Sequence, residues 1–201
     1  MEWIKQAHML GHELRIKAEE SSLWGTRLGE FCERSQTICV NGSCTLSLCR
    51  LVSIHELVHA ADSLFGLRLK DWQTDMVAGI LHDVSVRSPG IAQWLGHTTV
   101  ERLEGNRTLH LLSSKLLVMS VSSDLWRGPA ACVNYQEGVV LVEEAAGAQD
   151  QRSGVLYAAL VAGLNILHTH LRRAGVAALT EAWLSLLRNS PELTEWWWSD
   201  E

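Results

Sequence analysis

Residues His55 to Asp83 read HELVHAADSLFGLRLKDWQTDMVAGILHD, and this stretch decides the predicted fold. Two segments with helical apolar spacing flank Gly66-Leu67, which is typical of a helix, a tight turn and a second helix. Ser53 can cap the first helix, with Glu56 three residues on completing a capping box. The stretch therefore predicts His55 near the start of one helix and the pair His82-Asp83 at the end of the next.

The rest of the sequence also predicts mainly helices. They are expected over residues 2–20, 109–126, 137–148, 154–173 and 176–189. Asn41-Gly42 between two β-prone runs predicts one short hairpin near residues 36–49. We find no internal repeat. We expect an all-α, HD-domain-like helical bundle over residues 51–190, with an N-terminal extension (1–50) and a Trp-rich tail (191–201).

Composition excludes several classes of function. The chain has 201 residues and a formal net charge of −6, which argues against a nucleic-acid partner because such binding needs a basic surface. It contains no apolar run long enough to span a bilayer, and its N-terminus lacks the apolar stretch of a secretory signal. We expect a cytoplasmic protein without membrane contact. Four of its five cysteines, Cys32, Cys39, Cys44 and Cys49, match no zinc spacing; free thiols are expected, with a metal knot or a disulfide pair as alternatives.

Histidine and aspartate side chains gather in the central part of the sequence and are the candidate metal ligands. Such mixed ligands suit iron, manganese, zinc or magnesium. The segments HELVHAADSLFGL, MVAGILHD and KLLVMSVSSDLW together resemble the HD superfamily of metal-dependent phosphohydrolases. In that superfamily a His on one helix joins a His-Asp pair at the end of the next, and a later Asp completes the ligands.

Residues 53–188 show a closer resemblance to bacterial YqeK-type HD proteins, carried by LGHTTVERLEGNRTLHLLSSKLLVMSVSSDLWRGP and by the C-terminal helical segments. The resemblance implies a hydrolase of diadenosine tetraphosphate or another small phosphorylated nucleotide, with two metal ions, iron or manganese. The metal ligands it implies are His55, His82, Asp83, His97 and Asp124. Asp83 would bridge the metals, and Arg87 (the nearest cation), Arg107 or Arg127 would clamp phosphate. A family His is missing and a family Lys is Val86 here, so a one-metal or inactive relative is an alternative.

The same first helix also carries the zinc-metalloprotease motif HExxH, as His55-Glu56-Leu57-Val58-His59. Two histidines one turn apart can hold zinc, and the glutamate can act as general base. A third ligand would come from an acidic residue elsewhere: Glu101, Glu104, Glu143 or Glu144. This is the alternative enzymatic function.

Trp196, Trp197 and Trp198 stand next to one another near the C-terminus. Three consecutive tryptophans cannot share one helix face, so some pack on the domain, a partner or a second copy. A homodimer through this tail is one expectation. A non-catalytic helical interaction module is the second alternative function.

Overall fold

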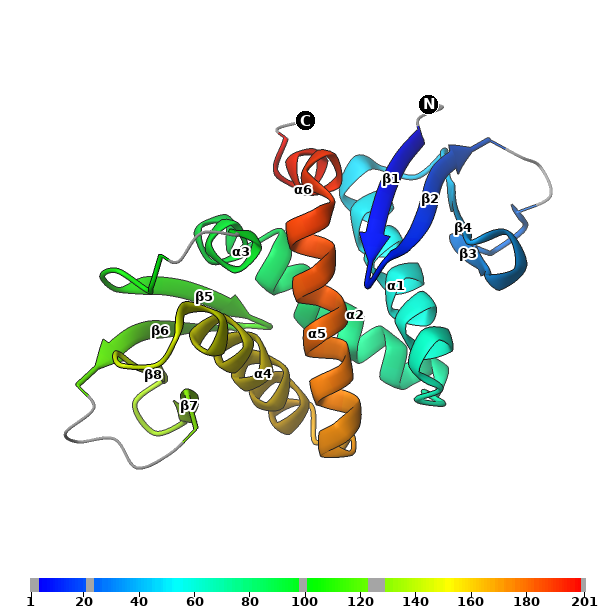
Figure 1. Ribbon diagram of the computed structural model, residues 1–201. Coiled ribbons are helices and arrows are strands. Elements are labelled where there is room, and N and C mark those ends of the chain that lie inside the picture. Colours follow the sequence, from blue (N-terminus) through cyan, green and yellow to red (C-terminus); the bar gives the residue numbers. More distant parts are fainter. Residues whose placement is uncertain (1–3, 21–23, 98–100, 123–128, 200–201) are drawn as a thin grey trace.

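The computed structural model describes residues 4–20, 24–97, 101–122 and 129–199. About 50% of the chain is helical and 24% is strand, in two four-stranded mixed sheets, so the fold class is α/β. The prediction of an all-α, HD-like helical bundle is therefore wrong. The two sheets lie on opposite sides of a layer of helices (Figure 1).

The first sheet and the three helices after it come from the first half of the chain. The strand order is β1-β2-β4-β3; β2 and β4 are parallel, and the two outer pairs are antiparallel. A 3-10 turn, η2, links β3 to β4. The elements are β1 (Ile4–Met9), β2 (His12–Glu19), β3 (Gly29–Cys32), η2 (Glu33–Ser35), β4 (Thr37–Asn41), α1 (Leu46–Phe65), α2 (Asp71–Ser85) and α3 (Pro89–Gly96).

The second half repeats this arrangement. Its strand order is β5-β6-β8-β7, with the same parallel and antiparallel pairs. Its elements are β5 (Arg107–Leu111), β6 (Ser114–Val121), β7 (Ala131–Asn134), β8 (Val139–Glu143), α4 (Ala148–Ile166), α5 (Arg173–Asn189) and α6 (Pro191–Trp198). Equivalent positions differ by 102: Thr37 and Val139 begin β4 and β8, and Pro89 and Pro191 begin α3 and α6. The expectation of no internal repeat is wrong.

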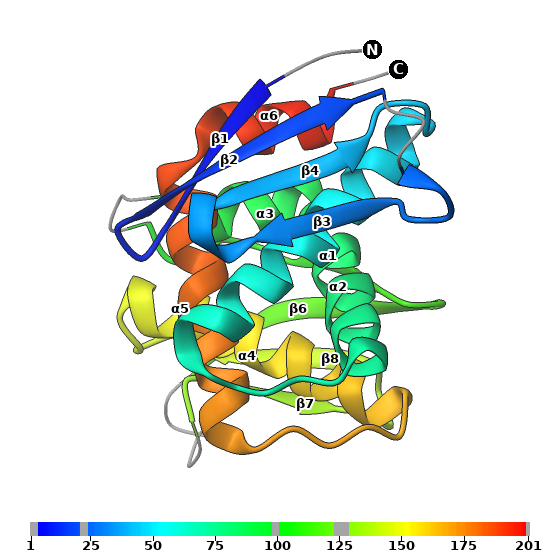
Figure 2. The same cartoon turned by 90° about the vertical axis from the view of Figure 1, so that its right-hand side faces the viewer.

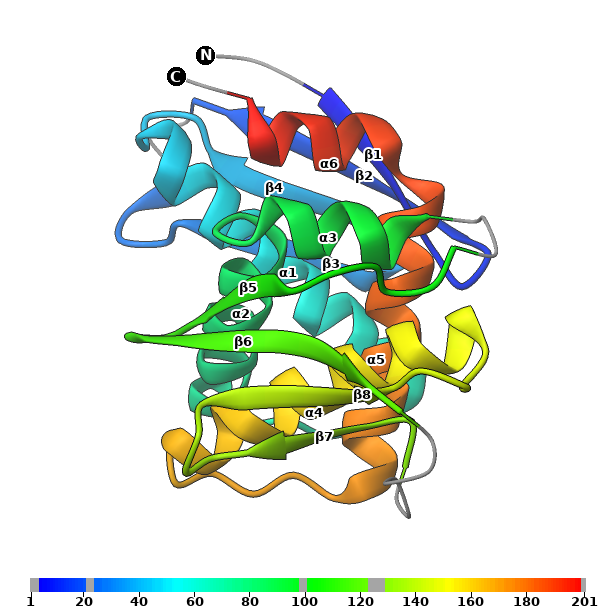
Figure 3. The ribbon, with the colours of Figure 1, turned by 90° about the vertical axis from the view of Figure 1, so that its left-hand side faces the viewer.

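The two halves pack crosswise, as the subunits of a two-fold dimer do when they exchange contacts. Strand β1 packs on α5 and α6 of the second half, and β5 packs on α2 and α3 of the first (Figures 2 and 3). The contacts recur in pairs: the backbone N–H of His8 donates to Ser190 Oγ at 2.7 Å, and that of His110 donates to Ser88 Oγ at 2.8 Å. Since one buried apolar cluster runs through both halves, neither half has a complete core of its own.

Several predicted helices are strands. Residues 2–20 contain the β1–β2 hairpin, in which Leu14, Ile16 and Ala18 are buried at alternate positions, the two-residue period of a strand. Residues 109–126 and 137–148 likewise contain β5, β6 and β8 within the described residues. Strands β1 and β5 pack on helices of the other half, a long-range contact that local spacing does not reveal.

The hairpin predicted at Asn41-Gly42 is also wrong. Asn41 is the last residue of β4, and the chain then turns into α1, where Thr45 caps the helix through a hydrogen bond from the Leu48 N–H. Helix α1 thus begins seven positions before Ser53, at Leu46, although it ends at Gly66 as predicted, in a left-handed conformation with φ 60°.

The Trp-rich tail is helix α6 and packs within the chain. Trp197 is fully buried and stacks on Trp183 with ring centroids 5.8 Å apart. The indole N–H of Trp197 donates to Ser53 Oγ at 3.3 Å, and that of Trp198 donates to the Ser85 carbonyl at 2.6 Å. Trp197 thus belongs to the core of the chain, and the partly buried Trp198 packs against it. Among the described residues, no helix is both long and apolar enough to cross a membrane.

Candidate functional site

Two histidines of α1 face each other over one helical turn. The Nε2 atoms of His55 and His59 are 3.1 Å apart, and the rings meet edge to face with centroids 4.8 Å apart. Residues four apart lie on one helix face, so the HExxH spacing itself produces this approach. A tetrahedral metal ion with ligand bonds of about 2.0–2.1 Å holds two imidazole nitrogens roughly this far apart.

Asp75, on α2, is the acidic partner of this pair. Its Oδ1 lies 3.1 Å from Nδ1 of His55, while its side chain stays 68% exposed. A carboxylate on Nδ1 fixes the proton there and leaves the Nε2 lone pair directed at His59, as outer-shell carboxylates do for metal-binding histidines. Burial lowers the pKa of His55, and the neighbouring His59 lowers it further. Both effects favour the neutral imidazole, which is the form that binds metal.

Glu56, the glutamate of the motif, is buried against strand β3. Burial raises the pKa of its carboxyl to about 7; a hydrogen bond from the Phe31 backbone opposes this, and the charge of Glu30 adds to it. Gly29 in β3 lies so close that a Cβ there would meet Val52 Cγ1 at 2.5 Å and Glu56 Oε1 at 2.9 Å. The edge strand β3 therefore runs directly past the one carboxyl that the HExxH motif assigns to proton transfer.

Two cavities open on either side of these residues, and His55, Glu56 and Gly29 line both of them. The larger, of about 800 Å³, also includes His59, and we call it the catalytic cavity. The other, of about 450 Å³, is bounded by Asp75 and by apolar side chains of α1. A chain lying along β3 can thus pass over the histidine pair with side chains entering a cavity on each side.

The predicted HD ligands do not meet around one point. His55 contacts His59 and Asp75, whereas His82 lies seven residues beyond Asp75 on α2, about 10 Å along the helix axis. His97 is exposed at the end of α3, and Asp124 lies outside the described residues. In the described part of the chain, no group of three or more His, Cys, Asp and Glu side chains is placed to hold a metal ion.

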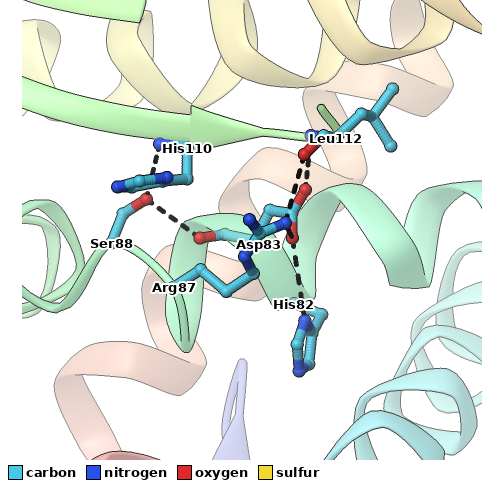
Figure 4. Close-up of polar contacts among 6 residues, drawn as sticks. All are labelled: His82, Asp83, Arg87, Ser88, His110 and Leu112. Atoms are coloured by element: carbon cyan, nitrogen blue, oxygen red, sulfur yellow. Dashed lines mark hydrogen bonds and ion pairs between the residues drawn. The ribbon is translucent and has the colours of Figure 1, made fainter. Parts of the chain in front are cut away.

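Asp83 instead joins the two halves (Figure 4). Its carboxylate accepts a short hydrogen bond from the Leu112 N–H and one of 3.0 Å from Nη1 of Arg87. The same Arg87 atom donates to the Leu112 carbonyl at 3.1 Å. Burial raises the pKa of Asp83, but hydrogen bonds from His82, Leu112 and Arg87 outweigh it and leave the pKa below its usual value. Asp83, the predicted bridging carboxylate, and Arg87, a predicted phosphate clamp, thus bind each other and the turn between β5 and β6.

The other predicted ligands also lie elsewhere. Of the acidic residues suggested as a third zinc ligand, none of Glu101, Glu104, Glu143 and Glu144 lines either cavity beside His55. Asp75 was missed because its role depends on how α2 packs against α1. None of the described cysteines forms a disulfide, as expected for free thiols.

The second half has the same backbone without the motif. Tyr157, Ala158 and Val161 occupy the positions of His55, Glu56 and His59, and Ala177 that of Asp75. The repeat therefore carries one candidate centre. The sequence does contain signals of the repeat. Ser88-Pro89 and Ser190-Pro191 lie at the spacing that relates the two halves, as do Arg50 and Arg152.

No protein-family model, curated protein or solved structure matches this chain.

Proposed function

We propose that the chain is a metal-dependent peptidase of the HExxH type, in which His55 and His59 hold a zinc ion and Glu56 is the general base. The observation that carries this proposal is the approach of the two Nε2 atoms to 3.1 Å, in a cavity that the buried Glu56 also lines. A phosphohydrolase of the HD type loses its support, because that assignment depends on an all-α fold.

Asp75 is our candidate for the third protein ligand. It is the only acidic side chain, among the described residues, that forms an ion pair with either histidine of the motif. Its carboxylate sits on Nδ1 of His55, so it has to turn toward the Nε2 side when metal binds. Its high exposure leaves it room to do so. A catalytic zinc site usually has three protein ligands and one open position.

Peptide hydrolysis follows from these placements. A zinc ion held by His55 and His59 would supply the Lewis acid that acidifies a water molecule and polarises the substrate carbonyl. Glu56 accepts the proton of that water as its oxygen attacks the carbonyl carbon. The C–N bond then breaks, and the proton passes from Glu56 to the leaving amine. The edge strand β3 would align an extended substrate chain through backbone groups other than the Phe31 N–H, which Glu56 already binds.

The test combines metal analysis with cleavage of fluorescein-labelled casein by the zinc-loaded protein. We expect Glu56→Ala to keep about one zinc and to lose cleavage. His59→Ala is expected to lose both, and Asp75→Ala to bind zinc at least tenfold more weakly.

His82→Ala is the matched control, since it removes an imidazole from the neighbouring helix. It should keep zinc and activity. Full casein cleavage by Glu56→Ala, or zinc retained by His59→Ala and lost by His82→Ala, would contradict the proposed function.

A further inference from the structure

A groove continues from the catalytic cavity into the second half of the molecule. A cavity of about 700 Å³ lies between the segments that follow α1 and α4, and we call it the axial cavity. It shares Gly66 and Arg68 with the catalytic cavity, and it shares His170 and Leu171 with a third cavity in the second half. Figure 2 shows both linking segments on the face toward the viewer. The three cavities thus form one path, which we call the axial groove.

The third cavity, of about 450 Å³, is the counterpart of the catalytic cavity. Tyr157 and Val161 line it where His55 and His59 line the other, and Arg173 stands in the place of Asp71. The motif residues have been exchanged for an aromatic and an apolar side chain, yet the hollow persists. A hollow with the shape of a substrate site and without its ligands can bind a chain but not cleave it.

Two of the three cavities of the groove carry a charge opposite to that of the whole protein. The catalytic cavity differs from them, because Glu30, Glu33, Glu56, Asp62 and Asp71 line it. The axial and third cavities are lined by Arg68, His170, Arg172 and Arg173, and by no acidic side chain of the described residues. All four are exposed, and none forms an ion pair within the part of the chain that the structure describes. In a chain with a net charge of −6, such a cluster of unpaired cations favours an anionic occupant.

We propose that the axial groove is an extension of the substrate site and takes an acidic segment of the polypeptide that is cleaved at the HExxH motif. The inference rests on the proposed function, because a groove continuous with a peptidase site is expected to receive the same chain. The second half would then select substrates, while the first half cleaves them.

Binding is measured first, without cleavage, on zinc-loaded Glu56→Ala protein. The probe is fluorescein-labelled decaglutamate, followed by fluorescence anisotropy at low ionic strength. We expect the double variant Arg68→Glu/Arg172→Glu to weaken binding about tenfold or more, and added salt to weaken binding to the parent. Arg15→Glu/Lys115→Glu is the control, since it makes the same charge change at two exposed sites, on β2 and β6, that line none of these cavities. Equal affinity of the double variant and the control would overturn the proposal.

A decathymidylate strand serves as the second probe. If it binds as tightly as decaglutamate and depends equally on Arg68 and Arg172, the groove is a general anion site and the polypeptide assignment is wrong. Decaglutamate binding that is tighter and sensitive to the double variant supports the assignment.

Cleavage provides the second arm. A casein peptide that the wild-type protein cleaves is resynthesised with a six-glutamate extension. For the wild type we expect the KM of the extended peptide to be at least fivefold lower than that of the original peptide. For Arg68→Glu/Arg172→Glu we expect the two KM values to be equal. An extension without effect on KM, with cleavage intact, would overturn the groove and leave the peptidase standing. Groove-dependent binding without any cleavage would support the groove and overturn the peptidase.

Discussion

Replacement of Glu56 by glutamine should remove a pH-dependent loss of stability from the metal-free protein. Burial raises the pKa of Glu56 from 4.5 to about 7, so the folded state holds its proton over a pH range in which the unfolded chain has lost it. Stability from this group is complete below pH 4.5 and is lost as pH rises through 7. At about 1.4 kcal/mol per pH unit, the full loss is roughly 3 kcal/mol.

The assay is urea unfolding with EDTA present, at pH 5, 6, 7 and 8, for the wild type and Glu56→Gln. We expect the difference in unfolding free energy to shift in favour of the variant as pH rises, by up to about 3 kcal/mol at pH 8. The titration of His55 is common to both proteins and largely cancels in the difference.

Glu195→Gln on α6 is the control, because Glu195 is exposed and its substitution should leave the pH profile parallel to that of the wild type. A Glu56→Gln profile that is also parallel would refute the reasoning, because it would show that the Glu56 carboxyl titrates alike in the folded and unfolded chains.

Three further predictions concern the contacts that join the halves. Gly163→Ala should destabilise the protein by about 1–3 kcal/mol in urea unfolding, because its Cβ would meet Ile80 Cγ1 at 2.5 Å; Ile80→Val should recover part of this loss, and additive losses would contradict the contact. Asp83→Ala should lower the free energy of unfolding by about 2–4 kcal/mol in the same assay, because it leaves the partly buried Leu112 N–H without its acceptor. Asp83→Ser keeps an acceptor, as in the second half, so a cost equal to that of the alanine variant would refute the link. Trp197→Ala should lower stability by about 3–5 kcal/mol and, because the tail closes the shared core, lower the thermal midpoint of both halves in one transition; two separate transitions would show that the halves fold independently.

The sequence by itself determined the local features that depend on near neighbours. Gly66 ends α1 because the left-handed residue after a helix favours glycine, and Pro89 begins α3 because its fixed φ suits a first helical turn. His55 and His59 face each other because the HExxH spacing is one helical turn. These features involve few residues and short separations, so the order of side chains is enough to specify them.

Only the tertiary structure decided the sheets, the repeat and the surroundings of the motif. The strands around Leu14 and Leu116 carry polar residues at alternate positions, and each is stabilised by a parallel partner and by the hairpin strand that packs on helices of the opposite half. Asp75 reaches His55 because α2 packs on α1, and Asp83 binds Leu112 instead of a metal because β5 crosses to α2. The halves share a backbone with few identical side chains, since apolar packing accepts many residues of similar size. Contacts between distant positions thus place Asp75, rather than His82, beside His55.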